Sequence, residues 1–224
     1  MSTISTPTTY GQDASIAKFS VARYQKMIET GILAPDDKVE LLENYVVLKM
    51  PRKPPHDGTI DLLMAAIGLR LPAGWLPRVQ RAVEFSDSQP EPDFAVARGT
   101  ARSYLARHPR PSDIGLLVEV AESSLLRDQR DKARIYARGG IVCYWIVNLP
   151  DRQVEVYTQP SGPASTPDYA SIQTYASGDQ IALVLDGQTV ASVAVDDVLP
   201  KIVESFSYAA TGVFVRLRRN AIYE

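Results

Sequence analysis

The hydrophobic pattern of this chain centres on residues 116–148, which read LLVEVAESSLLRDQRDKARIYARGGIVCYWIVN. Two short apolar runs, rich in β-branched and aromatic residues, flank a segment dominated by charged side chains. Short apolar runs of this composition are typical of buried strands, and the charged segment between them is long enough for a helix. The pattern therefore predicts a buried strand, a charged helix and a second buried strand in the middle of the fold.

Upstream of this unit, the pattern predicts a helix, a hairpin, a second helix and two strands. Ser20 is a suitable N-cap for the first helix, and Gly31 can close it. Apolar residues spaced three and four apart predict the second helix. The predicted elements are helix 21–30, with Val21, Tyr24, Met27 and Ile28 on its inner face, two strands within 39–50 that turn at Asn44, helix 56–71, strand 75–85 and strand FAVA after Asp93.

Downstream, the runs VEVYTQP, SIQTYAS, IALVL and TVASVAV predict an antiparallel extension of the sheet, and VDDVLP predicts a short helical turn. In the tail, GVFVRLRR is compatible with an edge strand or a pairing surface. Residues 1–18 are rich in Ser and Thr, so we expect a flexible N-terminal arm. With no internal repeat or long linker, we expect one domain over residues 19–200 and a C-terminal extension over residues 201–224.

Composition narrows the class of protein. Of the 224 residues, 45% are hydrophobic and 22% are charged, which is ordinary for a globular protein. The net charge of −2 argues against a protein that coats nucleic acid nonspecifically, because such binding depends on neutralising phosphates. The single cysteine, Cys143, cannot form an internal disulfide, which favours a cytoplasmic protein. We expect no membrane segment, since no run approaches about 18 uncharged apolar residues, and no secretory signal.

Two acids and a lysine are the candidate chemistry. Glu119 lies inside an apolar strand, where an ionised carboxylate is costly unless it is paired, hydrogen-bonded or bound to a metal. Asp93 lies at the mouth of another strand, and Lys132 follows Asp128 by one helical turn, on the same face. Two carboxylates about 5 Å apart would repel each other by on the order of 3 kcal/mol at a dielectric constant near 20, so the pair needs a cation.

Oxygen ligands with a few waters suit Mg²⁺ or Mn²⁺, whereas Zn²⁺ usually takes His or Cys, of which the chain has only three. Such a metal would activate a water and neutralise charge on a phosphate, and Lys132 is the candidate to assist that water. Simpler interpretations exist. Asp93 could only begin a strand, Glu119 could face solvent, and spacing alone favours Asp128 and Lys132 as an exposed ion pair worth about 0.3 to 0.5 kcal/mol.

The most basic stretch of the chain, residues 98–110, contains no acid. It is compatible with a solvated loop or with a loop that contacts phosphates near the acidic cluster. The arginines of this stretch are Arg98, Arg102, Arg107 and Arg110.

Four ordered motifs, VELLENYVVLKMPRKPPH, EPDFAVA, LLVEVAESS and RDQRDKARIYARGGIVCYWIVN, resemble the Uma-two family of restriction endonuclease-like proteins, a branch of the PD-(D/E)XK nuclease superfamily. The resemblance covers residues 19–200. It implies an α/β fold with a restriction endonuclease-like core, in which a central mixed β-sheet is flanked by helices and the acids lie on core strands. The extra antiparallel strands would then lie at the C-terminal end.

Residue by residue, the proline–aspartate motif falls on Pro92 and Asp93, and the second acid falls on Glu119. The lysine that usually stands two residues beyond that acid is replaced by Ala121. The resemblance implies that the function of this lysine has moved to the following helix, where Asp128 and Lys132 fit the D-x-x-x-K pattern of the family. Glu40 matches the early glutamate of the family, as a metal ligand or water-orienting group, and His56 matches its histidine. Two departures are the turn Glu43-Asn44-Tyr45, where a G-E-like turn is common, and Asn148, which replaces an aspartate.

The resemblance implies an endonuclease dependent on Mg²⁺ (or Mn²⁺) that hydrolyses DNA phosphodiester bonds. Asp93 and Glu119, with Glu40, would hold the metal, Lys132 would assist the water, and His56 and Asp128 would support them. The modest net charge is equally compatible with broad cutting of DNA, with a preference for special DNA structures and with a homodimer. The alternative is a catalytically silent nucleic-acid-binding or protein-interaction module, which the missing strand lysine favours; a nucleotide-binding domain is disfavoured because no Gly-rich loop follows a strand. Further phosphate contacts are expected from the helix arginines Arg127, Arg130 and Arg134.

Overall fold

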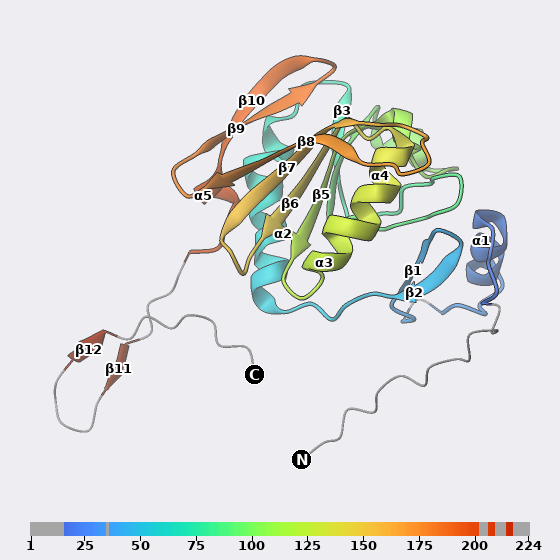
Figure 1. Ribbon diagram of the computed structural model, residues 1–224, viewed down its shortest axis with the longest axis horizontal. Coiled ribbons are helices and arrows are strands. Elements are labelled where there is room, and N and C mark those ends of the chain that lie inside the picture. The colour runs from blue at the N-terminus through green and yellow to red at the C-terminus, as the bar shows by residue number, and fades with distance from the viewer. Residues whose placement is uncertain (1–15, 35, 202–205, 209–213, 217–224) are drawn as a thin grey trace.

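The computed structural model describes residues 16–34, 36–201, 206–208 and 214–216. Its centre is a six-stranded mixed sheet in the order β3-β4-β5-β6-β7-β8, in which β5 and β6 are parallel and the other neighbours are antiparallel (Figure 1). The prediction of a mixed sheet flanked by helices is confirmed. The strands are β3 (Trp75–Val79), β4 (Phe94–Arg98), β5 (Ile114–Ala121), β6 (Cys143–Asn148), β7 (Gln153–Pro160) and β8 (Tyr169–Ala176).

Parallel strands need a crossover, and the charged segment of the sequence supplies it between β5 and β6. This crossover begins at Leu125, and its central turn is π-helical, with hydrogen bonds one residue longer than in an α-helix. Gly140 ends it with φ of 77°, in the left-handed region that favours glycine. The crossover consists of α3 (Leu125–Arg127), the π-helical turn Asp128–Lys132 and α4 (Ala133–Gly139).

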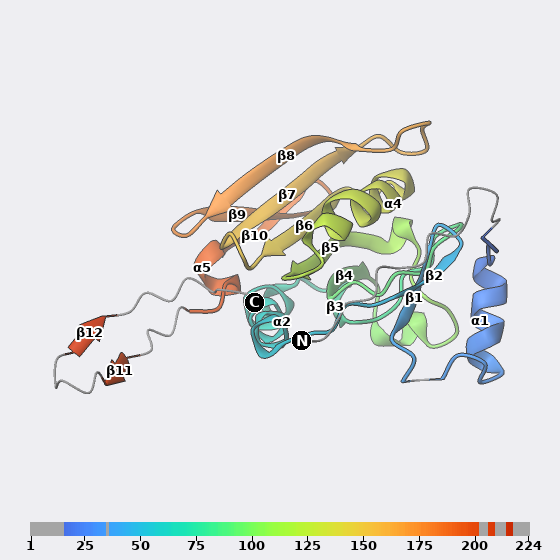
Figure 2. The same cartoon turned by 60° about the horizontal axis from the view of Figure 1, so that its bottom comes forward.

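Side chains alternate across the sheet and fill two separate cores, one on each face. Val118 and Val120 face α2 (Pro54–Ala66) and α5 (Val195–Val198), whereas Leu117 faces α4, packing with Tyr136. Figure 2 shows α2 and α4 on opposite faces of the sheet. Because Glu119 alternates with Val118 and Val120, its carboxylate points toward the crossover helix. Cys143 is buried.

The N-terminal hairpin of β1 (Val39–Leu42) and β2 (Tyr45–Leu48) confirms the predicted turn at Asn44. Glu43 and Asn44 have φ of 49° and 68°, the left-handed pair that a two-residue hairpin turn requires. Helix α1 (Val21–Glu29) begins after Ser20, whose Oγ accepts a hydrogen bond from the Arg23 amide. The predicted inner face of α1 is wrong at Ile28, whose side chain is 47% exposed. Tyr24 is the one buried residue of this helix.

Three predicted boundaries differ from the structure. Helix α2 begins two residues early, with Pro54 at its first position, and ends at Ala66, after which Gly68–Arg70 form a 3₁₀ turn. The strand expected over 75–85 stops at Val79, because Gln80 has φ of 49° and leaves the extended region. Two further 3₁₀ turns, Ala101–Tyr104 and Pro111–Asp113, lie within and after the basic stretch.

The C-terminal strands extend the sheet only in part. Strands β7 and β8 join it as predicted, but β9 (Gln180–Leu185) and β10 (Gln188–Ala194) form a separate antiparallel pair. The reason is the side-chain alternation of β9, which buries Ile181, Leu183 and Leu185 in the core on the α2 face. The expected helical turn is α5, and in the tail β11 (Phe206–Tyr208) pairs with β12 (Phe214–Arg216). The rest of the predicted tail from residue 202, and residues 1–15 of the predicted arm, lie outside the described residues.

Within the part of the chain that the structure describes, no helix has the length and apolar character needed to cross a membrane.

Candidate active site

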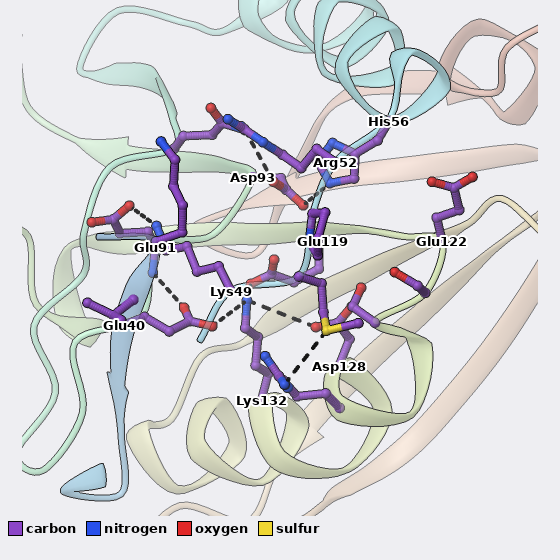
Figure 3. Close-up of a pocket in the computed structure, with 18 of the residues that line it drawn as sticks. Glu40, Lys49, Arg52, His56, Glu91, Asp93, Glu119, Glu122, Asp128 and Lys132 are labelled. Carbon is purple, nitrogen blue, oxygen red and sulfur yellow. Dashed lines mark hydrogen bonds and ion pairs between the residues drawn. The ribbon is translucent and has the colours of Figure 1, made fainter. Parts of the chain in front are cut away.

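A cavity of about 720 Å³ opens beside the N-terminal hairpin, between α2 and the start of the crossover. Its walls come from β1, the segment after β2, α2, the loop before β4, β5 and the π-helical turn. Segments far apart in the sequence therefore meet here (Figure 3). The predicted site residues that line this cavity are Glu40, His56, Asp93, Glu119, Asp128, Lys132 and Arg127.

Lys132 lies at the centre of a carboxylate cluster. Its Nζ is 2.9 Å from Glu119 Oε1, 3.6 Å from Glu40 Oε1 and 3.9 Å from Asp128 Oδ1. All four residues are at most 6% exposed, and Figure 3 shows Glu40, Asp128 and Lys132 pointing toward one another. Burial of this degree excludes a solvent-facing Glu119 and an exposed pair of Asp128 and Lys132.

The electrostatics of this cluster follow from burial and mutual proximity. Burial raises the pKa of Glu119 well above its ordinary value, although the Lys132 ammonium opposes this. Burial also raises the pKa of Asp128 to about 6, again against Lys132. For Lys132, burial alone would lower the pKa, but the carboxylates, Glu119 first, outweigh it and raise the pKa well above its usual range. Lys132 is therefore a protonated donor at neutral pH.

Asp93 is held by His56 from α2 and by the backbone of β5. Its Oδ2 is 3.1 Å from His56 Nε2 and accepts a hydrogen bond of 2.9 Å from the Val120 amide. Burial would raise the pKa of Asp93, but the hydrogen bond and charge of His56, the charge of Lys132 and the Val120 amide together outweigh it, and the net shift is downward. Conversely, burial would lower the pKa of His56, but Asp93 and, to a lesser degree, Asp57 together outweigh it, and the net shift is upward. Asp93 is therefore ionised, and its Oδ1 has only one contact, 3.5 Å from Gln80 Nε2.

Glu40 reaches the cluster because the hairpin is anchored to the crossover helix. Its Oε2 accepts a hydrogen bond of 3.2 Å from the Glu91 amide. At the turn, Glu43 accepts hydrogen bonds of 2.7 and 3.0 Å from Arg134 and of 2.8 Å from Arg138. The departure from a G-E-like turn thus places a carboxylate where α4 presents two guanidinium groups.

The donor set suits a hard divalent cation. Among the described residues, Glu119 Oε2 has no hydrogen bond, and Asp93 Oδ1 has only the long contact with Gln80. The described wall of the cavity carries eight carboxylates against five Lys and Arg side chains and His56, so carboxylates outnumber the cations. In the described part of the chain, no group of three or more His, Cys, Asp or Glu side chains is placed so that it could hold a metal ion. Mg²⁺ does not require one, because it commonly takes one or two carboxylates and keeps several waters.

Several residues of the site were not predicted. Tyr136 donates a hydrogen bond of 2.6 Å to Glu119 Oε1, and Ser124 donates one of 2.6 Å to Asp128 Oδ2. The spacing of Tyr136 four residues after Lys132 was a signal, since it places both on one helical face. Gln80 carried no such signal, because its contact with Asp93 depends on the turn that ends β3.

The basic stretch does not contribute to the cavity wall. Arg98 forms an ion pair with Asp186, Arg107 with Asp113 at 2.6 Å, and Arg110 with Glu84 at 3.4 Å. Arg130 is exposed and also lies outside the wall. In contrast, Arg127 lines the cavity and donates a hydrogen bond of 2.7 Å to the Leu48 carbonyl. The residues predicted to contact nucleic acid that do not line the cavity are Arg98, Arg102, Arg107, Arg110, Arg130 and Arg134.

Comparisons with known proteins agree with this architecture. Residues 21–194 match the model of the Uma2 family, described as "Putative restriction endonuclease". No curated protein matches the chain. One similar solved structure is a crystal structure described as a putative nuclease belonging to DUF820 from Anabaena variabilis, with 12% identity and a TM-score of 0.56. The match covers 80% of this chain and 97% of that one, and it shows a shared fold.

Proposed function

Since the chain belongs to the Uma2 family of restriction endonuclease-like proteins, we propose that it is a metal-dependent endonuclease that hydrolyses phosphodiester bonds in DNA. The observation that carries this proposal is the meeting of Asp93, Glu119 and Lys132 in one cavity, although they lie on three different elements. Glu40 completes the group from a fourth element. Deeply buried carboxylates around one lysine are costly for folding, which supports a chemical role.

Asp93 and Glu119 would hold Mg²⁺ or Mn²⁺, with Glu40 nearby as a further ligand or a group that orients water. When bound, the metal would supply Lewis acidity, which makes water a better nucleophile at neutral pH and neutralises charge that develops on a phosphate. The chain itself contributes fixed positions. His56 holds Asp93 through Nε2, and the Val120 amide holds the same carboxylate oxygen.

Lys132 acts as a donor rather than as a base in this proposal. Because its neighbours hold it protonated, its ammonium positions the attacking water or contacts a phosphate oxygen in the transition state. Glu40, Glu119 and Asp128 fix where this ammonium points. Tyr136 limits the freedom of Glu119 by donating a hydrogen bond to the same oxygen that faces Lys132.

The test is cleavage of linear, supercoiled and branched DNA with Mg²⁺ or Mn²⁺, compared with EDTA. We expect native protein to cut at least one of these forms, and Asp93→Asn and Glu119→Gln to lose cutting by at least 100-fold while remaining folded. Asp113→Asn is the matched control, since this carboxylate pairs with Arg107 away from the cavity. Metal-independent cutting, or cutting that survives in both cavity variants, would contradict the proposal.

A second candidate is a catalytically silent module that binds nucleic acid or protein. Two observations favour it: Lys132 already neutralises Glu119 at 2.9 Å, and the strand position of the usual lysine is the buried Ala121. Such a module would bind its partner equally well with EDTA and with Mg²⁺. A cytoplasmic location and a homodimer stay predictions. Light scattering of the purified chain measures its oligomeric state.

A further inference from the structure

The cations that would attract a polyanion must lie mostly outside the cavity, because carboxylates outnumber cations on its wall. Three arginines of the basic stretch are already engaged, since Arg98, Arg107 and Arg110 are each paired with a carboxylate. Two arginines near the end of β3 differ from these. In the described part of the chain, Arg78 and Arg81 have no ion pair and no hydrogen bond. Both cations are therefore available to an external anion.

Arg78 is oriented by its surroundings although no anion holds it. It lies opposite Ala95 in the pairing of β3 with β4, which places its side chain on the α4 face of the sheet. Its guanidinium lies 4.9 Å from the centre of the Tyr104 ring. The Nε atom is buried without a partner, whereas the two Nη atoms, which also lack one among the described residues, are not buried. A guanidinium stacked on a ring has a fixed plane, and its free fork of donors suits a phosphate.

The charge around Arg78 is positive and uncompensated. Burial lowers the pKa of Arg78, Tyr104 opposes this, and Arg81 lowers the pKa further, with no contribution from a described carboxylate. Burial and then Arg78 likewise lower the pKa of His108. Two neighbouring arginines without a counter-charge repel each other, so an anion bound between them would relieve this repulsion. Acids of the neighbouring loops are already paired: Asp113 with Arg107, Glu84 with Arg110 and Glu91 with Lys49.

The two arginines flank a residue of the cavity wall. Gln80 lines the cavity, and its Nε2 is 3.5 Å from Asp93 Oδ1. Arg81 follows Gln80 directly and Arg78 precedes it by two residues, so their Cα atoms lie about 4 Å and at most about 7 Å from that of Gln80. Each strand of a DNA duplex carries a phosphate about every 3.4 Å along the helix axis. A nucleic acid with one phosphate at Asp93 therefore brings further phosphates close to both arginines.

We propose that Arg78 and Arg81 form a phosphate-binding site beside the cavity, which holds a backbone phosphate of the nucleic acid near the one to be cleaved. This inference rests on the proposed nuclease function and names residues that bind its substrate outside the metal-binding group. Because phosphates carry no base information, the site does not discriminate between sequences. A free phosphate offers the same chemical group, and the experiment separates the two sources.

The experiment uses the full chain and one labelled sequence of about 20 nucleotides, as a single strand and as a duplex. Fluorescence anisotropy with Ca²⁺ measures binding between about 50 and 200 mM NaCl, and gel analysis with Mn²⁺ measures cutting. Each lost phosphate contact should make the slope of log affinity against log salt shallower by about 0.9 for the duplex or about 0.7 for the single strand. We expect this change, and at least fivefold weaker binding at the lowest salt, in Arg78→Gln and in Arg81→Gln.

Two further variants show whether the effect belongs to this site. Arg81→Lys keeps the charge and should retain the native slope. Arg70→Gln is the matched control, because it removes the same charge from an arginine that pairs with Asp197 and does not line the cavity, and it should leave the slope unchanged. Thermal unfolding confirms that each variant is folded. Arg81 is exposed, so Arg81→Gln keeps the test decisive even if Arg78→Gln unfolds.

Unchanged slopes in both glutamine variants, or an equal change in Arg70→Gln, overturn this inference even if the protein cuts DNA. Titration calorimetry with inorganic phosphate tests the other source. If phosphate binds the native protein, Arg78→Gln abolishes that binding and the DNA slopes do not change, the site takes a free phosphate and the backbone assignment is overturned. Slopes that depend on the two arginines, without cutting under any metal, support this inference and instead overturn the nuclease proposal. Absence of binding to both DNA forms overturns both.

Discussion

Glu43 offers a sharp test of how the hairpin is fixed to the site. Its carboxylate accepts hydrogen bonds from Arg134 and Arg138, and Arg138 also donates two bonds of 2.9 Å to Asp87. The substitution Glu43→Gln keeps the shape of the side chain and removes its charge. The hairpin that carries Glu40 would then lose its main link to the crossover helix.

The hydrogen bond from Arg134, which outweighs the cost of burial, lowers the pKa of Glu43 from 4.5 to about 2. At about 1.36 kcal/mol per pKa unit, a shift of roughly 2.5 units corresponds to about 3.4 kcal/mol of stability. The side chains of Glu43 and Arg134 are 29% and 38% exposed, so solvent screening reduces this value. We expect Glu43→Gln to cost about 1 to 2 kcal/mol at pH 7.

The sign of the pH dependence follows from the lowered pKa. The contribution of Glu43 is fully present above about pH 5, where the unfolded chain is also ionised, and is lost as the pH falls toward 2. Urea unfolding at pH 7, 5, 4 and 3.5 measures it as the difference in unfolding free energy between native protein and variant. That difference should shrink steadily below pH 5.

The matched control is Glu29→Gln, which removes the exposed pair with Lys26 and should cost less than about 0.5 kcal/mol. A Glu43→Gln cost below that level at pH 7 would refute the reasoning, as would a cost that does not change between pH 7 and pH 3.5.

The remaining predictions concern the buried cluster, the metal and the helix packing. Lys132→Met should destabilise the fold by about 3 to 5 kcal/mol in urea unfolding, because it leaves Glu119 buried without its counter-charge, and adding Glu119→Gln should restore part of that loss; a double variant no more stable than the single one would argue against the pair. Titration calorimetry should show Mg²⁺ or Mn²⁺ binding by native protein and by Asp113→Asn, and none by Asp93→Asn; equal binding by all three would remove the metal site. Gly139→Ala should cost about 1 to 3 kcal/mol, because the new Cβ would lie 2.4 Å from the Phe85 ring. In Gly58→Ala, in α2, the new Cβ would meet nothing within 4 Å, and the variant should stabilise the fold by about 0.5 to 1 kcal/mol. Thermal unfolding midpoints measure both glycine variants, and midpoints that move in the same direction would contradict this packing.

Local sequence patterns determined the elements that depend on short-range chemistry. The apolar runs of β5 and β6 are too rich in β-branched and aromatic residues for a surface position, and the crossover between them follows from their parallel pairing. The hairpin turn needs two residues with positive φ, and Asn44 supplies one of them readily. Glu119 was recognisable because a carboxylate in a buried strand demands a partner.

The candidate site was partly predictable for the same reason. Asp93, Glu119 and Lys132 have ionisable side chains, and such side chains have few roles among apolar residues. Their meeting in one cavity depends on sheet order and on the face toward which each side chain points, which a strand–helix–strand unit constrains strongly. Glu40 and His56 carried weak signals alone, and the resemblance to a family supplied them.

Tertiary structure alone decided which charged residues are engaged elsewhere. Nothing in the local sequence shows that Arg98 pairs with Asp186, 88 residues away, or that Glu43 meets Arg134. The separate hairpin of β9 and β10 is likewise a tertiary outcome. It covers an apolar face near α2, and strands that continued the central sheet could have covered that face instead. Periodicity reports which side of an element is apolar, a short-range property. Which surface covers that side, and which charges meet there, depends on contacts between segments distant in the chain, and those exist only once the chain has folded.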